Sequence, residues 1–171
     1  ENKINIKYIY QENAGKSQAH NKGVLHAQYE LFSCVDSDDF VTENAIDIIL
    51  DTYEKNVDYI GFVFGRKTPT GKIITQWPKG LTKGTTLREA YQNYKMSGDT
   101  MLVYKTEIIK RHQFPHFKGE KFVPESYLYD QLDQEGNLVF TNKNIYICQY
   151  LEDGYTASME KIIHDNPRGY E

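Results

Sequence analysis

The sequence predicts an α/β fold, in which helices cover both faces of a central sheet. Segments with the apolar pattern of strands alternate along the chain with segments whose apolar residues recur at helical spacing. One strand segment, residues 31–35, is a short continuous apolar run, which is typical of a buried parallel strand. The 171 residues suffice for one domain of ordinary size, and neither an internal repeat nor a linker divides them.

The first third of the chain is expected to begin with a strand over residues 4–10, where alternating apolar residues give way to an almost wholly apolar run. A helix is expected over residues 17–28, and the buried strand at 31–35 follows it. That strand ends at Asp36-Ser37-Asp38-Asp39, here named the acidic loop. Thr42 is a suitable N-cap for the next helix, whose apolar residues are spaced by three and four: Ala45, Ile46, Ile49, Leu50 and Tyr53.

The rest of the chain continues the alternation. A strand is expected at residues 59–64, and turn residues at 68–72 allow Ile73 and Ile74 to return as a hairpin arm. Residues 77–86, rich in Gly and Lys, predict a surface loop. The remaining elements are, in order, a helix over 87–95, a strand over 100–104, a helix from 124 to about 135, strands at 138–140 and 145–148, and a helix over 158–164.

The charges and the cysteines narrow the function. With 20 basic and 24 acidic residues and no dense basic run, nucleic-acid binding is not favoured. No apolar window approaches the ~20 residues that a transmembrane helix requires, and the first residues have no signal-peptide or transit-peptide pattern. Cys34 and Cys148 lie far apart in apolar runs, which indicates buried thiols in a reducing compartment. Together these features predict a cytoplasmic domain.

The acidic loop is the most informative segment for chemistry. Ligands of open α/β sheets bind beyond the carboxyl ends of the strands, where this loop is expected. Its three carboxylates repel one another, and a hard cation such as Mg²⁺ or Mn²⁺ would relieve the repulsion and hold a diphosphate. The alternative is that the aspartates only cap the helix that begins near Thr42. Both interpretations stand at this point.

Three other known motifs resemble parts of this chain, two of them at the acidic loop and one at residues 15–17. An EF-hand loop starting at Asp36 would need Asp or Asn where Phe40 stands and Gly where Val41 stands, so it is excluded. A phosphatase of the haloacid-dehalogenase type also uses Asp-x-Asp after a strand, but Phe40 replaces its Thr or Val. Gly15-Lys16-Ser17 matches the end of a Walker A motif, yet its first glycine would fall at Tyr10. An Asp-dependent phosphatase is kept as a minor alternative.

A longer pattern covers residues 11–40. Asn13-Ala14-Gly15 is followed by Ala19-His20-Asn21-Lys22-Gly23, and a helix and a strand then lead into Asp36-Ser37-Asp38. This resembles the family 2 glycosyltransferases of the GT-A fold, in which Asn-x-Gly-x-x-x-Ala-Arg-Asn-x-Gly precedes an Asp-x-Asp motif. Residues 57–64 and 98–106 also resemble the later part of that domain. The resemblance implies a GT-A-like fold with a mainly parallel, Rossmann-like sheet flanked by helices.

The resemblance also implies an activity. Such enzymes transfer a sugar, here a hexosyl or N-acetylhexosaminyl group, from a nucleotide-diphosphate sugar, most often a UDP-sugar, to a hydroxyl acceptor with inversion. Asp38, with Asp36 or Asp39, would hold Mn²⁺ or Mg²⁺. Asp36 is also a candidate for contact with the ribose. Lys16, His20 and Asn21 are further candidates for donor contacts, although His20 stands where the family has Arg.

The catalytic base implied by the resemblance is Glu125. The family carries a Glu-Asp pair at a helix start, and Glu125-Ser126 matches it with Ser in the second position. The alternative is that Glu125 only complements the helix dipole. Asn21 could equally fix its loop as a buried polar residue, and Lys16 could be a solvated charge. On the acceptor side, Asp99 and Trp77 are candidates for sugar binding.

The resemblance further implies a partial domain, because nothing before Ile4 supplies the strand, helix and second strand with which the family opens. Residues 1–66 would form the donor and metal part, and residues 67–171 the acceptor-side part. A carbohydrate, lipid-linked or polymeric acceptor is expected, in bacterial cell-surface polysaccharide synthesis, in the cytoplasm or at the inner face of the membrane. Homo-oligomerisation is left open. The alternative function is a non-catalytic fragment that a partner completes.

Overall fold

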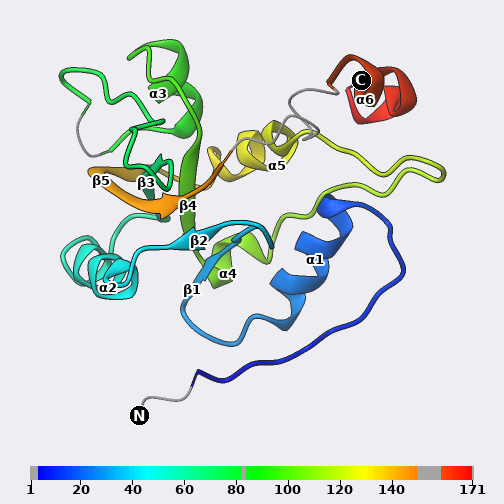
Figure 1. The fold of residues 1–171 in the computed structure, drawn as a ribbon, viewed down its shortest axis with the longest axis horizontal. Helices are drawn as coiled ribbons and strands as arrows, with labels where there is room; N and C mark the ends of the chain where they lie inside the picture. Colours follow the sequence, from blue (N-terminus) through cyan, green and yellow to red (C-terminus); the bar gives the residue numbers. More distant parts are fainter. Residues whose placement is uncertain (1–3, 82–83, 150–158, 171) are drawn as a thin grey trace.

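The computed structural model describes residues 4–81, 84–149 and 159–170 and has the predicted α/β architecture (Figure 1). Strands and helices alternate, which confirms the fold class. The strands are β1 (Leu31–Ser33), β2 (Phe40–Val41), β3 (Gly61–Lys67), β4 (Thr100–Lys105) and β5 (Leu138–Ile147). The helices are α1 (Lys16–His26), α2 (Ala45–Glu54), α3 (Leu87–Gln92), α4 (Thr106–Ile109), α5 (Glu125–Leu132) and α6 (Met159–Asp165), followed by the 3-10 turn η2 (Pro167–Gly169).

The five strands form one mixed sheet in the order β1-β4-β3-β5-β2. Only β3 and β5 are parallel, whereas β1 with β4, β4 with β3, and β2 with β5 are antiparallel. The expectation of a mainly parallel sheet was therefore wrong. The chain leaves β3 and enters β4 at the same end of the sheet, so β4 runs back along both of its neighbours. For the same reason β1 is an antiparallel, half-buried strand rather than the expected buried parallel one.

The sheet divides the core into two clusters, one on each face. Phe62 and Phe64 of β3 point to the face covered by α2, while Val63 between them points to the other face. On that second face the sheet packs against α1, α3, α4 and α5 through apolar residues such as Val24 and Leu128. Figure 1 shows α2 on the side of the strands away from α1 and α5. Both faces are therefore covered, as the sequence predicts.

The strand predicted at residues 4–10 is absent. Ile4, Ile6, Tyr8 and Tyr10 are between 72% and 88% exposed, and the segment runs along the outside of α1 (Figure 1). A strand is stabilised by its neighbours rather than by its own propensity, and no described strand lies beside this segment. The outer edge of β1 also has no neighbouring strand, because β4 is its sole partner among the described residues.

Smaller differences concern where elements begin and end. The two strands predicted near the end form one strand, β5, because a shift in its register with β3 carries the pairing across the intervening residues. Ile73 forms an isolated bridge with Lys67, as the predicted hairpin arm requires. Cys34 is exposed, contrary to expectation, whereas Cys148 is buried. Residues 82–83 of the predicted loop and residue 158 of the last predicted helix lie outside the described residues.

Among the described residues, the helices are all too short or too polar to cross a lipid bilayer.

Candidate functional site

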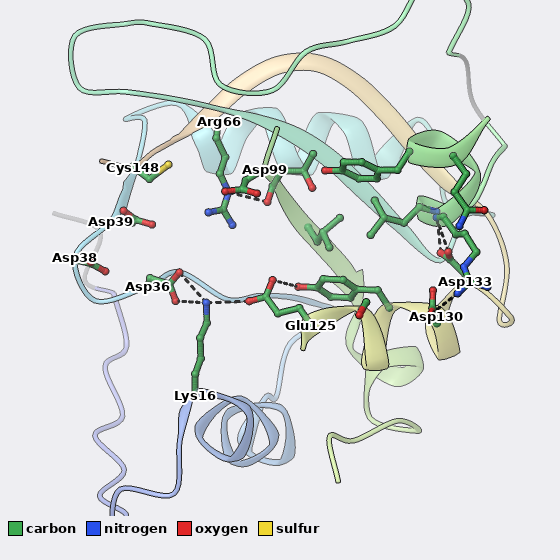
Figure 2. A pocket seen from close by; sticks show the side chains of 18 of the residues that line it. Lys16, Asp36, Asp38, Asp39, Arg66, Asp99, Glu125, Asp130, Asp133 and Cys148 are labelled. Carbon is green, nitrogen blue, oxygen red and sulfur yellow. Dashed lines mark hydrogen bonds and ion pairs between the residues drawn. The ribbon is translucent and has the colours of Figure 1, made fainter. Parts of the chain in front are cut away.

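A cavity of about 920 Å³ lies where β1, β3 and β5 end and β4 begins (Figure 2). This is the end of an α/β sheet at which ligands usually bind. The acidic loop follows β1, Arg66 lies near the end of β3, and Asp99 precedes β4. The cavity thereby brings together six residues that the sequence predicts for the site: Lys16, Asp36, Asp38, Asp39, Asp99 and Glu125.

The turn before α1 aims Lys16 into this cavity. The side-chain oxygen of Asn13 accepts a hydrogen bond from the backbone N–H of Gly15 at 3.1 Å, as in an Asx turn. Gly15 has a φ of 89°, a conformation that favours glycine. A Cβ atom there would overlap the backbone carbonyl oxygen of Lys121. The local Asn-x-Gly sequence thus fixes both where the helix begins and where Lys16 points.

Lys16 joins the two halves of the site. Its Nζ lies 2.8 Å from Oδ1 of Asp36 and 3.0 Å from Oε1 of Glu125 (Figure 2). Burial opposes the charge, but Glu125 and Asp36 together raise the pKa of Lys16 above its usual value, so the ammonium stays protonated. Lys16 is therefore an ion-paired part of the site and not a solvated charge.

The acidic loop is tied to the middle of the sheet by Tyr146 of β5. The hydroxyl of Tyr146 accepts a hydrogen bond from the backbone N–H of Asp36 at 3.1 Å and donates one to Oδ2 of Asp39 at 2.7 Å. Strand β2 then separates the loop from α2, whose first-turn acid is Asp47. The alternative that the aspartates cap this helix is therefore wrong.

The acidic loop offers oxygen ligands to a divalent cation but is not a complete metal site by itself. In the part of the chain that the structure describes, no group of three or more His, Cys, Asp or Glu side chains is arranged so that it could hold a metal ion by itself. Asp36 is paired with Lys16, and Asp39 accepts from Tyr146. Mg²⁺, however, is usually held by one or two carboxylates together with substrate phosphates rather than by a protein cage. The oxygen ligands that Asp36, Asp38 and Asp39 offer are of the kind that such an ion prefers.

Glu125 occupies the first position of α5, with Pro124 as the N-cap residue. Its side chain is half-exposed and faces the cavity, where it pairs with Lys16 and accepts a hydrogen bond from the hydroxyl of Tyr129 at 3.4 Å. Burial, with a further contribution from Glu125, raises the pKa of Tyr129, so this phenol stays protonated. Glu125 therefore has specific partners in addition to the helix dipole.

His20 lines a second cavity, of about 420 Å³, that shares Lys16, Asp36 and Glu125 with the first. Its ring packs edge-on against Phe32 and Phe114, with ring centroids 5.3 Å apart in both cases. Burial lowers the pKa of His20, so the imidazole is neutral at pH 7. A neutral ring can form hydrogen bonds to a donor, but it carries no charge that could offset the charge of a phosphate.

Asn21 and Trp77 lie outside the site. The amide of Asn21 is buried and exchanges two hydrogen bonds of 2.9 Å with the backbone of Phe114, which supports the alternative that it fixes its loop. Trp77 packs against the core cluster beside α3 and lines neither cavity. Neither residue is positioned to contact a donor or an acceptor in these cavities.

The sequence analysis missed Arg66, which lines the cavity, and Tyr146, which holds the acidic loop from behind it. The Arg66 guanidinium lies 4.3 Å from the centre of the Tyr146 ring, and its Nε donates a hydrogen bond to the carbonyl of Thr100 at 2.8 Å. Although burial opposes it, Tyr146 and Asp99 raise the pKa of Arg66. Figure 2 shows Lys16 and Arg66 reaching into the cavity from opposite sides. An arginine directly after an apolar strand was the available signal for Arg66.

Comparisons with known proteins identify the family and the fold. Residues 1–113 match the family described as Glycosyl transferase family 2. Glycosyltransferase GlyG of Streptococcus pneumoniae serotype 4 is 25% identical over 83% of this chain and 51% of its own length. Crystal structures of S. aureus TarS residues 1–349 share the fold. The complex with UDP-GlcNAc has a TM-score of 0.68 at 17% identity, and the match covers 88% of this chain and 43% of the TarS 1–349 chain. The complex with UDP has a TM-score of 0.64 at 16% identity, covering 92% and 46%. The chain thus spans about half the length of these relatives.

Proposed function

Because the chain belongs to glycosyl transferase family 2, we propose that it transfers a sugar from a UDP-sugar to a hydroxyl acceptor, with inversion. The observation that carries the proposal is the placement of Lys16, which contacts Asp36 on the proposed donor side and Glu125 on the proposed acceptor side of one cavity. Residues 1–66 would supply most of the donor side and residues 67–171 the acceptor side. A bacterial cell-surface carbohydrate or polymer is the acceptor class that we propose.

On the donor side, Asp36 and Asp38, with Asp39, would hold Mn²⁺ or Mg²⁺ against the diphosphate. When bound, the cation would supply charge neutralisation for the departing nucleotide. Lys16 and Arg66 add two cationic groups to the same cavity, where they can bind phosphate oxygens. The neutral imidazole of His20, in the adjoining cavity, is suited to a hydrogen bond with the nucleoside rather than to a phosphate contact.

On the acceptor side, Glu125 would act as the general base. The acceptor oxygen forms its bond to the anomeric carbon while the bond from that carbon to the phosphate oxygen breaks on the opposite face. The proton of the acceptor hydroxyl passes to the carboxylate of Glu125. Lys16 holds this carboxylate in the cavity, and Asp99 lies on the wall where an acceptor hydroxyl can be bound.

Donor binding is the first test. Isothermal titration with UDP and with UDP-GlcNAc, in Mn²⁺ and then in EDTA, should show metal-dependent binding that Asp38→Asn weakens by about tenfold or more. Binding that is absent, or unchanged by EDTA, would contradict the proposed donor site. It would favour instead a non-catalytic domain that a partner completes, a candidate supported by the unpaired outer edge of β1 in the described structure.

The base is tested separately. Glu125→Gln should leave the affinity for UDP within about twofold. It should slow the formation of UDP from UDP-GlcNAc by about 10² to 10⁴-fold, the usual contribution of a general base. The matched control is Glu107→Gln, which changes another first-turn glutamate away from both cavities. Equal turnover in Glu125→Gln and the wild type would assign the base to another residue.

A further inference from the structure

Tyr146 makes three contacts that converge on the acidic loop and on Arg66. Its hydroxyl contacts the backbone N–H of Asp36 and the carboxylate of Asp39, and its ring lies against the Arg66 guanidinium. We propose that Tyr146 is a positioning residue, which holds the carboxylates of the acidic loop in the arrangement needed to bind a metal–diphosphate group. This inference rests on the proposed function and adds to it a residue that touches neither donor nor acceptor.

The backbone of Tyr146 is rigidly placed. Strand β5 pairs with β2 on one side, where Tyr146 faces Val41, and with β3 on the other, where it faces Arg66. The side chain is fully buried, so its hydroxyl has one position relative to the sheet. The acidic loop, in contrast, is partly exposed and connects an edge strand of three residues to a strand of two. The side chain of Tyr146 therefore links the acidic loop, which lies between two short strands, to a strand that is paired on both sides.

The two hydrogen bonds act on different parts of the loop. The bond from the Asp36 N–H fixes the backbone where β1 gives way to the loop, and the bond to Asp39 fixes a carboxylate near its end. Without them, mutual repulsion would let the aspartates move apart, and the loop would have to be ordered again whenever a cation and a diphosphate bind. Partners of this kind, which hold metal ligands in place, typically change metal affinity by about 10- to 100-fold when they are removed.

The chain offers a matched pair of variants. Tyr146→Phe removes the hydroxyl and keeps the ring against Arg66. Tyr53→Phe removes the hydroxyl of a tyrosine on α2, which donates a hydrogen bond to the carboxylate of Glu30 at 2.7 Å and lines neither cavity. Both changes delete one phenol oxygen that donates to a carboxylate, so any difference between them reports what the Tyr146 hydroxyl does for the acidic loop.

Two measurements decide the proposal. In the protein without metal or nucleotide, amide hydrogen exchange at Asp36 should accelerate about tenfold or more in Tyr146→Phe and stay unchanged in Tyr53→Phe. In titrations with UDP and Mn²⁺, affinity should fall about tenfold in Tyr146→Phe and less than about twofold in Tyr53→Phe. The unfolding temperature of both variants should stay within a few degrees of the wild type.

The outcomes separate the two claims. If the wild type binds no Mn²⁺–UDP, the proposed function fails, and exchange at Asp36 still decides whether Tyr146 holds the loop. If exchange and affinity are the same in Tyr146→Phe and Tyr53→Phe, the positioning role is overturned. Global unfolding of Tyr146→Phe overturns it as well, because the hydroxyl would then serve the core as a whole rather than the loop.

Discussion

At the scale of single residues, opposite charges that line the cavity form ion pairs. Lys16 pairs with Asp36 and Glu125, so one cation offsets a carboxylate on each side of the proposed reaction centre. Both pairs are partly exposed, and solvent screening keeps the contribution of each to stability at about 1 kcal/mol or less. Their importance lies in geometry, because they hold two carboxylates from distant parts of the chain at a common point.

His20 leads to a prediction about pH at the same scale. Burial lowers its pKa in the folded state, so as pH falls below about 6.5 the unfolded chain takes up a proton before the folded protein does. Folding should therefore lose stability below about pH 6.5, by about 1.4 kcal/mol for each unit by which the pKa is lowered.

Urea denaturation at pH 7.5 and pH 5 tests this expectation. The loss of stability should be smaller in His20→Gln than in the wild type, because Gln has no proton to take up. His164→Gln is the control, since that side chain is 88% exposed and its loss should change nothing. An identical pH dependence in His20→Gln and the wild type would show that His20 does not titrate in this range.

At the scale of elements, the start of α1 depends on Gly15. The helix begins at Lys16, directly after a residue with positive φ that lies against the backbone of residue 121. The turn therefore fixes α1 against the segment that leads into α5, and this packing brings Lys16 and Glu125 together. The helix start is thus a structural requirement of the site as well as of the helix.

A pair of glycine variants tests this requirement. Gly71 also has a positive φ, of 88°, but nothing lies within 4 Å of the position of an added Cβ. Gly71→Ala should cost about 1 kcal/mol of folding free energy, the cost of the backbone conformation alone. Gly15→Ala should cost more, about 2–4 kcal/mol, because overlap with Lys121 is added. Equal losses of folding free energy in thermal or urea denaturation would mean that the backbone at Lys121 shifts to admit the Cβ without destabilising the fold.

At the scale of the whole molecule, the site is built from both halves of the chain. The acidic loop and Arg66 come from the first half, and Glu125 and Tyr146 come from the second. A ligand bound across this cavity contacts several elements at once, so its binding should stabilise the entire fold.

Thermal denaturation with UDP and Mn²⁺ tests this expectation. At a concentration about 100 times the dissociation constant, binding contributes about 2.7 kcal/mol, or roughly 5–10 °C for a chain of this size. EDTA should abolish the shift, and Asp38→Asn should reduce it, while Asp58→Asn, which lines neither cavity, should not. A shift that survives in EDTA would contradict the role proposed for the cation.

The sequence by itself determined the features that depend on residues close together in the chain. Apolar spacing predicted α1, α2, β3 and β4 to within a few residues. The same local pattern predicted the acidic loop after β1. Periodicity and turn chemistry act over a few residues, so they leave a readable pattern.

Only the tertiary structure decided the features that depend on distant partners. In the structure, β4 is antiparallel to both neighbours and residues 4–10 lie outside the sheet. Asn21 and Trp77 lie outside the site. The tertiary structure also placed Glu125 against Lys16, and Tyr146 against Asp36, which lies 110 residues earlier in the chain. Such contacts form because the sheet brings strand ends together, and no local pattern records which side chains will meet there.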